Sequence, residues 1–561
     1  VGGLPDPAVR EVVSRLQRAG PVKKTPVPES AADERPHHDT VETAIATAVS
    51  ASVGETRSTA RTRVRPMWRT VAIVALILVA VASYRAWPRN RHSLADGSAC
   101  RFVAVLPFAN TSGDAANEPF SDGLTDELIG TLGKVPKLTV AGRTTAFALK
   151  GKGLGVHALA DSLGVCAVLE GSVRREGRRL KATAQLVRTS NATVMWADSY
   201  DRELVAALST QEEIARSIVD AIRVALAVGA GSPSLRRSTA DPVAYELYLR
   251  GRSIFWQRTG RDGILQAASY FDRAIARDSL YARAYAGLSD AHTRLAVFGY
   301  GRPHEEFAKA KAAAQKALAL DSTLADAHAS LAHLLCVHDY NWAAAELEAR
   351  IAVALDPGYG FARIALAICL SSQGRLTEAT AHLDTAHVAD PLAPGPTLLL
   401  GRAYVNQGRP DQAIRCLKGV LELNPLSDLS YQQLGHAYLQ KNMYPQAIAA
   451  LRRAAELSGA RDSAELAYAY AVAGRRLEAK RIIQSLLRQP ELRYTVPFHI
   501  AMAYTGLGDI DEAFKWLDQG YESRASFMNG IKSERAFRPL HRDARWPRLL
   551  EQMGLRPQSA G

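Results

Sequence analysis

The cysteines are the side chains best suited to chemistry in this chain, and their spacing argues against catalysis and metal binding. Zinc ligation and thiol exchange both need cysteines, or cysteine and histidine, a few residues apart. No two of the five cysteines stand that close in the sequence. We therefore predict no metal site and no cofactor, and we expect all five to be small buried side chains. They are Cys100, Cys166, Cys336, Cys369 and Cys416.

Two other local patterns suggest nucleotide or acid–base chemistry, but each has a simpler explanation. The stretch 150–155 (KGKGLG) lacks the GxxxxGK[ST] spacing that cradles phosphates, so we predict a basic surface turn. Asp122, Asp126 and Glu127 cluster near the start of a predicted helix, where carboxylates interact favourably with the helix dipole. The DFG element of protein kinases is missing from the sequence. We therefore predict that the chain is not an enzyme.

Length and composition indicate a globular protein of several domains. The chain has 561 residues, of which 47% are hydrophobic and 22% charged. Its net charge of +13 could favour nucleic acid, but acidic and basic residues alternate instead of forming one basic run. Nucleic-acid binding is therefore disfavoured.

The first 87 residues divide into a polar tail and an apolar stretch. Residues 1–66 are rich in Pro, Ser, Thr and mixed charge, and are predicted to be disordered. Residues 70–84 carry no charge, and aromatic residues with arginines flank them on both sides, which is typical of a spanning helix. We expect one transmembrane helix at 67–87. Five arginines precede the uncharged stretch 70–84 and three follow it, which favours a cytoplasmic N-terminus.

Residues 101–228 alternate between predicted strands and helices, so we expect a small α/β domain. The predicted strands are 102–106, 138–141, 165–174, 179–186 and 194–200, and the predicted helices are 122–134, 157–163 and 210–228.

Five segments of this domain occur in a characteristic order: 103–114 (VAVLPFANTSGD), 120–132 (FSDGLTDELIGTL), 143–150, 163–177 (LGVCAVLEGSVRREG) and 196–204 (WADSYDREL). They resemble the TolB-like N-terminal domain of bacterial proteins that combine membrane anchors with repeat arrays. The resemblance implies an α/β fold and a binding or assembly role, and it transfers no catalytic residue. With the expected span and the arginine asymmetry, we expect a bacterial inner-membrane protein whose C-terminal domains are periplasmic.

After a linker at 229–242, a helix-pair pattern recurs every 34 residues. Gly401, Ala413 and Pro425 follow Ala367, Ala379 and Pro391 at that spacing. It is the period of tetratricopeptide repeats (TPRs), so residues 243–530 are predicted to form about eight repeats in one superhelix. Small residues should let paired helices approach closely, and residues 531–561 should form a closing cap and tail. The expected fold is therefore mostly α: a single transmembrane helix, a small α/β (TolB-like) domain and an all-α TPR solenoid.

In a TPR superhelix the first helix of each pair lines the concave groove, so its polar positions are candidates for binding a protein or peptide. The pattern by which chaperone-binding TPR proteins clamp a C-terminal carboxylate is not present, and that ligand is disfavoured. The candidate groove residues are Arg402, Asn406, Gln432, His436, Gln440 and Tyr468.

These features predict a non-catalytic, membrane-anchored protein that mediates protein–protein interaction, assembly or sensing at the bacterial envelope. The alternative is a truncated or degenerate signal transducer related to TPR-containing serine/threonine kinases, adenylate cyclases or winged-helix regulators. Self-association through the repeats is a third possibility.

Overall fold

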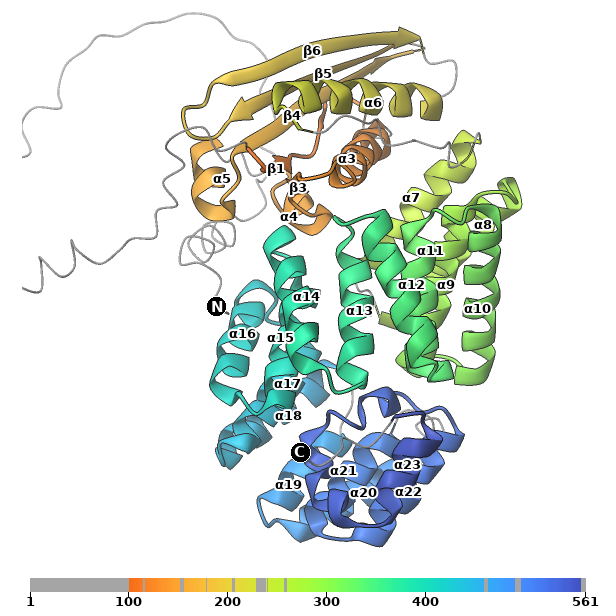
Figure 1. The fold of residues 1–561 in the computed structure, drawn as a ribbon, viewed down its shortest axis with the longest axis vertical. Helices are drawn as coiled ribbons and strands as arrows, with labels where there is room; N and C mark the ends of the chain where they lie inside the picture. The colour runs from red at the N-terminus through yellow and green to blue at the C-terminus, as the bar shows by residue number, and fades with distance from the viewer. Residues whose placement is uncertain are drawn as a thin grey trace, which may run out of the picture. The chain divides into compact units, whose positions relative to one another are not determined.

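A computed structural model describes most of the chain from residue 100 onward, and the statements on structure below concern these residues (Figure 1). They form an α/β part at 100–228, followed by successive helix pairs. The described ranges are 100–114, 117–151, 156–177, 179–203, 207–228, 239, 241–256, 260–458, 463–489 and 496–555.

The α/β part is built on a mixed sheet of strand order β3-β1-β4-β5-β6, with β2 paired to β4. β1 is parallel to β3 and β4, whereas β4, β5 and β6 form an antiparallel meander. Gly177 has φ = +56° just after β4, a backbone conformation that glycine adopts without steric cost. The strands are β1 (Phe102–Val105), β2 (Ala109–Asn110), β3 (Thr139–Val140), β4 (Ala167–Glu176), β5 (Arg179–Arg188) and β6 (Val194–Glu203).

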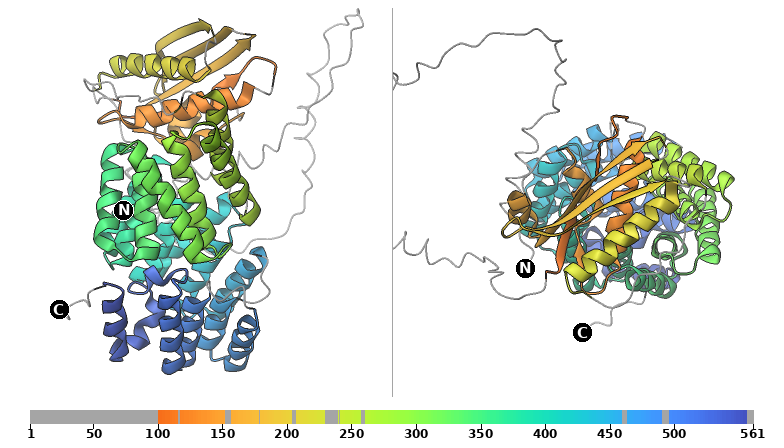
Figure 2. Two further views of the ribbon diagram at one scale, coloured as in Figure 1. Left: turned by 90° about the vertical axis from the view of Figure 1, so that its right-hand side faces the viewer. Right: turned by 90° about the horizontal axis from the view of Figure 1, so that it is seen from above.

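Helices cover both faces of this sheet because successive strand residues point to opposite sides. Val103 and Val105 join the core beneath α3 and α6, whereas Ala104 joins a smaller core with α5 and the end of α4. Figure 2 shows α6 lying across the strands. These helices are α3 (Glu118–Gly133), α4 (Arg143–Ala148), α5 (Val156–Leu163) and α6 (Ala207–Ala225).

The rest of the chain is a solenoid of helix pairs, in which the odd-numbered helix comes first in each pair. A π-helical turn, η2 (Leu335–Asp339), extends α11. The helices are α7 (Pro242–Trp256), α8 (Gly260–Arg277), α9 (Ala282–Val297), α10 (Pro303–Leu320), α11 (Ala325–Leu334), α12 (Trp342–Leu355), α13 (Gly360–Ser372), α14 (Leu376–Ala389), α15 (Pro394–Gln407), α16 (Pro410–Leu423), α17 (Asp428–Gln440), α18 (Tyr444–Leu457), α19 (Ala464–Val472), α20 (Arg476–Leu487), α21 (Pro497–Leu507) and α22 (Ile510–Glu522).

Glycine sets the close approach of the two helices in several pairs, as the repeat pattern predicted. A Cβ atom on Gly401 would lie 2.6 Å from Leu417 Cδ2, and one on Gly435 would lie 2.5 Å from Leu451 Cγ. Contacts that short do not occur between real side chains, so any larger residue would push the paired helices apart.

The C-terminal segment, residues 524–555, does more than cover the last helix pair. Phe537 packs against Phe498 of α21, with 5.1 Å between ring centroids. The same segment reaches back to early repeats, because Trp342 Nε1 donates to the Met553 carbonyl oxygen at 2.7 Å. The short helices of this segment are η4 (Met528–Gly530), η5 (Arg535–Arg542) and α23 (Arg545–Gln552).

The expected fold class, which included a single transmembrane helix, needs correction. None of the helices in the described ranges combines the length and the apolar character that crossing a bilayer requires. Helices of sufficient length keep a charged face, as α10 does with Lys309, Lys311 and Lys316, because only one face packs into the solenoid. The described chain is therefore a mostly helical protein, with an α/β part and a TPR-like solenoid. The predicted span at 67–87 and the predicted tail at 1–66 lie outside the described residues.

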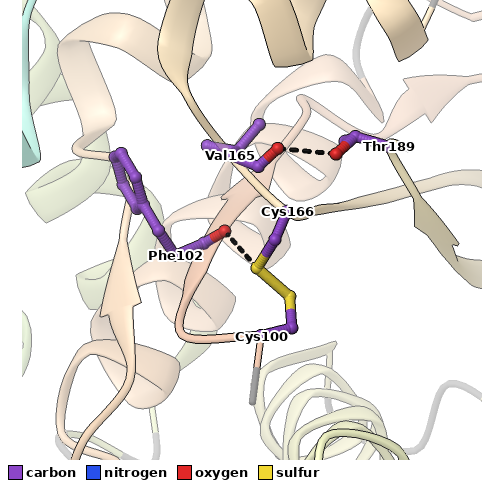
Figure 3. Close-up of a disulfide and its surroundings, with 5 residues drawn as sticks. All are labelled: Cys100, Phe102, Val165, Cys166 and Thr189. Atoms are coloured by element: carbon purple, nitrogen blue, oxygen red, sulfur yellow. Dashed lines mark hydrogen bonds between the residues drawn. A yellow bond between two sulfur atoms is a disulfide. The ribbon is translucent and has the colours of Figure 1, made fainter. Parts of the chain in front are cut away.

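The expectation that all five cysteines are free buried side chains is wrong for two of them. Cys100 and Cys166 form a disulfide that ties the start of β1 to the start of β4 (Figure 3). The Cys166 sulfur also lies 3.0 Å from the Phe102 carbonyl oxygen. Their spacing of 66 residues gives no signal in the sequence, because parallel pairing of β1 with β4 brings them together. The other three cysteines are free and buried, as predicted.

Candidate peptide groove

The six candidate groove residues all lie on first helices, in three consecutive repeats. Arg402, His436 and Tyr468 occupy equivalent positions, each directly after the small residue at the close contact within its helix pair. The candidates are Arg402 and Asn406 on α15, Gln432, His436 and Gln440 on α17, and Tyr468 on α19.

The C-terminal segment covers part of this surface. The Arg402 guanidinium carbon lies 5.8 Å from the centre of the Phe527 ring. Nearby on α13, Asn529 Nδ2 donates to Ser372 Oγ at 3.0 Å, and the Ser533 hydroxyl donates to the Ser371 carbonyl oxygen. The chain's own residues therefore occupy a face that the sequence predicted to be open to a ligand.

A cavity of about 40 Å³ is left between α13, α15 and the C-terminal segment. Arg402 and Asn406 both line it, and the Asn406 side chain belongs to a residue that is only 9% exposed. Residues four apart on a helix lie on the same face, so both side chains can address one ligand.

Three further candidates belong to a polar network deeper in the solenoid. The Gln432 amide donates to Glu465 Oε1, and His499 Nε2 lies 3.3 Å from the same oxygen. The rings of His436 and Tyr468 stack loosely, with 6.1 Å between centroids.

Glu534 is the acidic group that influences three of the candidates. Burial lowers the pKa of Arg402 and of His436, and the Glu534 carboxylate opposes both shifts. Burial raises the pKa of Tyr468, and Glu534 adds to that shift. Glu534 belongs to the C-terminal segment, so this segment sets part of the electrostatic environment of the candidate residues.

Gln440 has a structural role. Its amide donates to the Val405 carbonyl oxygen at 2.8 Å and so links α17 to α15. The structure thus places Arg402 and Asn406 at one cavity and Gln432, His436 and Tyr468 in one network, while Gln440 holds two repeats together.

The backbone of the C-terminal segment is strained where it meets this face. Phe527 has φ = +70° and Arg524 has φ = +52°, the left-handed region that side chains other than glycine rarely adopt. Such residues cost about 1–2 kcal/mol each and persist where the surroundings fix them. The Phe527 ring is fixed by His499, at 5.0 Å between centroids, and by Arg402.

The first helices of the early repeats carry a different set of side chains, which we call the charged cluster: Arg252, Arg283, Asp290 and Asp326. Arg252 pairs with Asp326 at 3.5 Å, and Ser330 Oγ donates to Asp290 at 2.5 Å. Burial raises the pKa of Asp290 to about 7, although the Ser330 hydrogen bond opposes that shift.

The α/β part contacts the solenoid through α3 and α4. Glu127 of α3 pairs with Arg283 at 3.5 Å. The Thr145 main-chain nitrogen and hydroxyl both donate to Asp390 Oδ1, at 2.8 and 2.6 Å. Burial raises the pKa of the Asp390 carboxyl, and these hydrogen bonds oppose the shift.

The acidic residues on α3 form ion pairs with basic residues that follow this helix in the chain. α3 begins at Glu118, so Asp122 and Asp126 lie beyond its first turn, and the helix-dipole interpretation was wrong. Lys150 pairs with Glu118 at 2.6 Å and with Asp122 at 2.5 Å. Arg143 pairs with Asp126 at 3.0 Å. The carboxylates anchor basic residues of the segment that follows.

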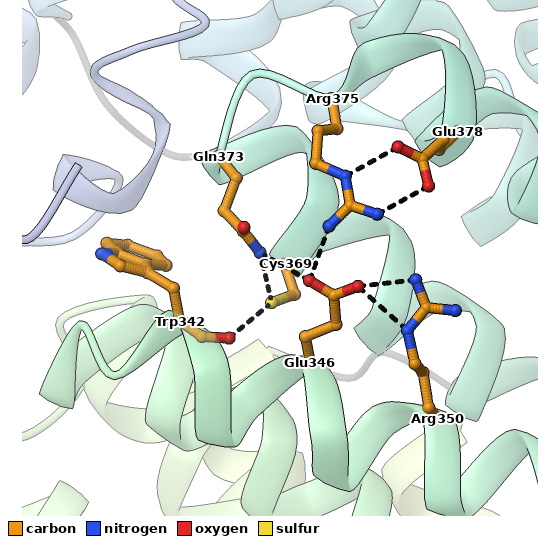
Figure 4. Close-up of polar contacts among 7 residues, drawn as sticks. All are labelled: Trp342, Glu346, Arg350, Cys369, Gln373, Arg375 and Glu378. Carbon is orange, nitrogen blue, oxygen red and sulfur yellow. Dashed lines mark hydrogen bonds and ion pairs between the residues drawn. The ribbon is translucent and has the colours of Figure 1, made fainter. Parts of the chain in front are cut away.

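An ion network joins three consecutive solenoid helices (Figure 4). Glu346 of α12 accepts from Arg350 at 2.6 Å and from Arg375 at 2.7 Å, and Arg375 also binds Glu378. Burial opposes ionisation of Glu346, but the hydrogen bonds outweigh it and lower its pKa. The network fixes the angle between repeats and supplies no reactive group.

Sequence reasoning missed the residues of this site that come from α13 and the C-terminal segment. Ser372 could have been found, because it precedes Asn406 by one 34-residue period. Phe527, Asn529 and Glu534 carry no local signal, because they reach the site only through the curvature of the whole solenoid.

Comparison with known proteins identifies the repeats. Two family models, both described as tetratricopeptide repeat, match residues 372–437 and 429–461. Putative adenylate cyclase 3 of Rhizobium meliloti (strain 1021) is 36% identical over 231 residues, which are 41% of this chain and 39% of that protein. The chain thus matches well under half of that relative's length.

Solved structures are similar to parts of the chain at low identity. YrrB, described as a TPR protein with an unusual peptide-binding site, is 22% identical with a TM-score of 0.23, over 35% of this chain and 91% of its own. The type IV pilus biogenesis factor PilW is 19% identical with a TM-score of 0.32, over 40% and 98%. The chain contains tetratricopeptide repeats, as predicted. The resemblance of residues 101–228 to TolB-like domains stays a prediction.

Proposed function

We propose that this protein is a non-catalytic interaction scaffold whose first helices recognise an extended segment of a protein partner. The observation that carries the proposal is that this face already holds an irregular segment of the chain itself. Asn529 and Ser533 hydrogen bond to α13, and Phe527 packs beside Arg402. Side-chain contacts to a non-helical segment are the way in which a TPR face binds a peptide.

The early repeats are the place where we expect a partner. His333 follows Leu331 and Ala332 on α11, as Arg402 follows Leu400 and Gly401 on α15, so it occupies the equivalent inner position. It is half-buried, and the charged cluster on this and the neighbouring first helices offers both signs of charge for recognition.

Site-specific photo-crosslinking in the native host tests this proposal. A photoreactive amino acid at His333 should give one discrete adduct with another protein, identified by mass spectrometry. The matched control is Leu347 on the outer side of α12, which is 59% exposed and should give none. Adducts only at Leu347 would move the binding surface outward, adducts only with the same chain would indicate self-association, and no adduct at either position would end the scaffold proposal.

The second candidate function is that of a nucleotide-signalling protein that makes cyclic AMP, which the similarity to the putative adenylate cyclase favours. Purified full-length chain, incubated with ATP and magnesium, would separate the two. We expect no cyclic AMP from the chain alone. Sustained production that copurifies with the chain would favour the second candidate.

We further propose that the α/β part resides in an oxidising compartment such as the periplasm, because disulfides persist there and are rare in the cytosol. The supporting observation is the Cys100–Cys166 disulfide. Protein trapped in whole cells with a thiol reagent and then denatured should show three reactive thiols without reductant and five with it. Five reactive thiols in both samples would reject this location.

A further inference from the structure

The cavity beside Arg402 holds two polar side chains whose hydrogen-bonding capacity is unused. Among the described residues, none forms an ion pair or hydrogen bond with the Arg402 guanidinium, and its contact is the Phe527 ring. The Asn406 amide is likewise without a hydrogen-bond partner in the described ranges, although its residue is 91% buried. Arg402 is half-buried, so the cavity brings a cationic donor and an amide donor together with no partner from the described residues. Polar groups withdrawn from bulk water usually have a hydrogen-bond partner, and here a ligand or water has to supply it.

Three other polar side chains around the cavity already have hydrogen-bond partners within the chain. Asn529 donates to Ser372 Oγ, and Ser372 Oγ donates to the Ile368 carbonyl oxygen at 2.9 Å. The Ser533 hydroxyl donates to the Ser371 carbonyl oxygen. A ligand would therefore meet Arg402 and Asn406 first.

Among the described residues, no acidic side chain forms an ion pair with the positive charge of Arg402 at the cavity. Glu534 is the nearby acid, but its carboxylate accepts from the Ala536 main-chain nitrogen at 3.1 Å and lies beyond ion-pair distance of Arg402. Burial accordingly lowers the Arg402 pKa despite that carboxylate. Gly530 leaves space for the Arg402 guanidinium, since a Cβ atom at position 530 would lie 2.9 Å from Arg402 Nη2.

Size restricts the ligand. The cavity measures about 40 Å³, and one water needs about 10–15 Å³ by the same measure, so it has room for a few waters or one small polyatomic ion. Arginine binds oxyanions through two parallel N–H groups, and an asparagine amide adds a third donor.

We propose that Arg402 and Asn406 form a binding site for a small oxyanion, a carboxylate or phosphate group, enclosed between α13, α15 and the C-terminal segment. The bound ion accepts hydrogen bonds from the guanidinium and from Asn406 Nδ2, and it neutralises the buried charge. This site does not depend on the proposed scaffold function, because the anion would be bound by the isolated chain.

Titration of purified full-length protein tests the site. Acetate and inorganic phosphate are added in separate series, with chloride keeping ionic strength constant, while binding is followed by calorimetry and by the thermal unfolding midpoint. We expect saturable binding of at least one of them, with the midpoint rising with its concentration. Arg402→Gln should weaken binding about tenfold or more, and Arg402→Lys should weaken it less because one charge remains.

Two controls make the result specific. Arg415→Gln, on the exposed side of α16, changes the net charge equally and should bind like the unaltered chain. Asn406→Leu keeps the charge and fills the cavity, so it should also abolish binding, and circular dichroism checks that each variant is folded. Equal affinity in Arg402→Gln and the unaltered chain, or no saturable binding of either anion, would overturn the proposal. The acetate and phosphate series then show which oxyanion fits.

Discussion

The two halves of the solenoid share one repeat pattern but use their first helices differently. In the late repeats, whose first helices are α13 to α21, the inner face packs against the C-terminal segment, and α13 and α21 join an apolar core that includes Phe537. In the early repeats, whose first helices are α7 to α11, the equivalent face carries the charged cluster and contacts α3 of the α/β part. The repeat period specifies which residues pack within a helix pair. It does not specify the side chains on the inner face, so these can differ in function from repeat to repeat.

The largest expected effect is on the late half. Phe537 is fully buried between Phe498 and Trp546, so Phe537→Ala should lower the free energy of unfolding by about 3–5 kcal/mol. Chemical denaturation measures the loss, and hydrogen exchange locates it. Exchange should rise in α13, α15 and α21 and stay unchanged in α7 and α8.

Leu477→Ala is the control for this variant, because Leu477 is 83% exposed and its truncation should change stability by less than about 0.5 kcal/mol. Equal loss of protection in both halves after Phe537→Ala would show that the solenoid unfolds as one unit, and the distinction between the halves would then be structural only.

The helix pairs could be predicted from sequence because each depends on residues close in the chain. Gly401 and Leu417, which form one such contact, are 16 residues apart and recur with the repeat period. The strands of the α/β part also lie within a few residues of their predicted positions, since alternating apolar residues mark them.

The position of the C-terminal segment and the disulfide could not be predicted, because both depend on contacts between residues far apart in the sequence. Ser526 Oγ donates to the Val297 carbonyl oxygen across 229 residues, and no periodicity encodes where a superhelix returns upon itself. The same reason explains the disulfide, whose partners meet only when β1 pairs with β4. The six groove candidates were chosen by their repeat position and stay a prediction, while the segment that covers part of that face was missed.

A pH-dependent effect should appear in the early half. The pKa of Asp290 is near 7 in the folded chain and about 4 when unfolded, so the folded state holds the proton more tightly between those values. Its contribution to stability therefore falls as pH rises from about 4 to 7. Asp290→Asn stays uncharged and keeps an acceptor for Ser330, so relative to the variant the unaltered chain should lose about 1–3 kcal/mol over that range.

Denaturation of both proteins at pH 4, 5.5, 7 and 8 measures the difference between their free energies of unfolding. Taking the difference removes the contribution of the titratable groups that the two proteins share. Asp326, Arg252 and Arg294 influence Asp290 and are identical in the two proteins. A difference that stays constant with pH would show that Asp290 is ionised throughout, and the charged cluster would then be an ordinary set of ion pairs.

The smallest effect tests the bridge between the halves. Trp342 on α12 donates from Nε1 to the Met553 carbonyl oxygen, and both groups are buried. Trp342→Phe leaves that oxygen unpaired and should cost about 1–2 kcal/mol. Trp516 offers a matched comparison, because its buried Nε1 has no hydrogen-bond partner among the described residues. Trp516→Phe removes a similar ring volume without breaking a hydrogen bond, so urea denaturation should show the smaller loss there. Equal losses would mean that ring packing, and not the hydrogen bond, holds the C-terminal segment against the early repeats.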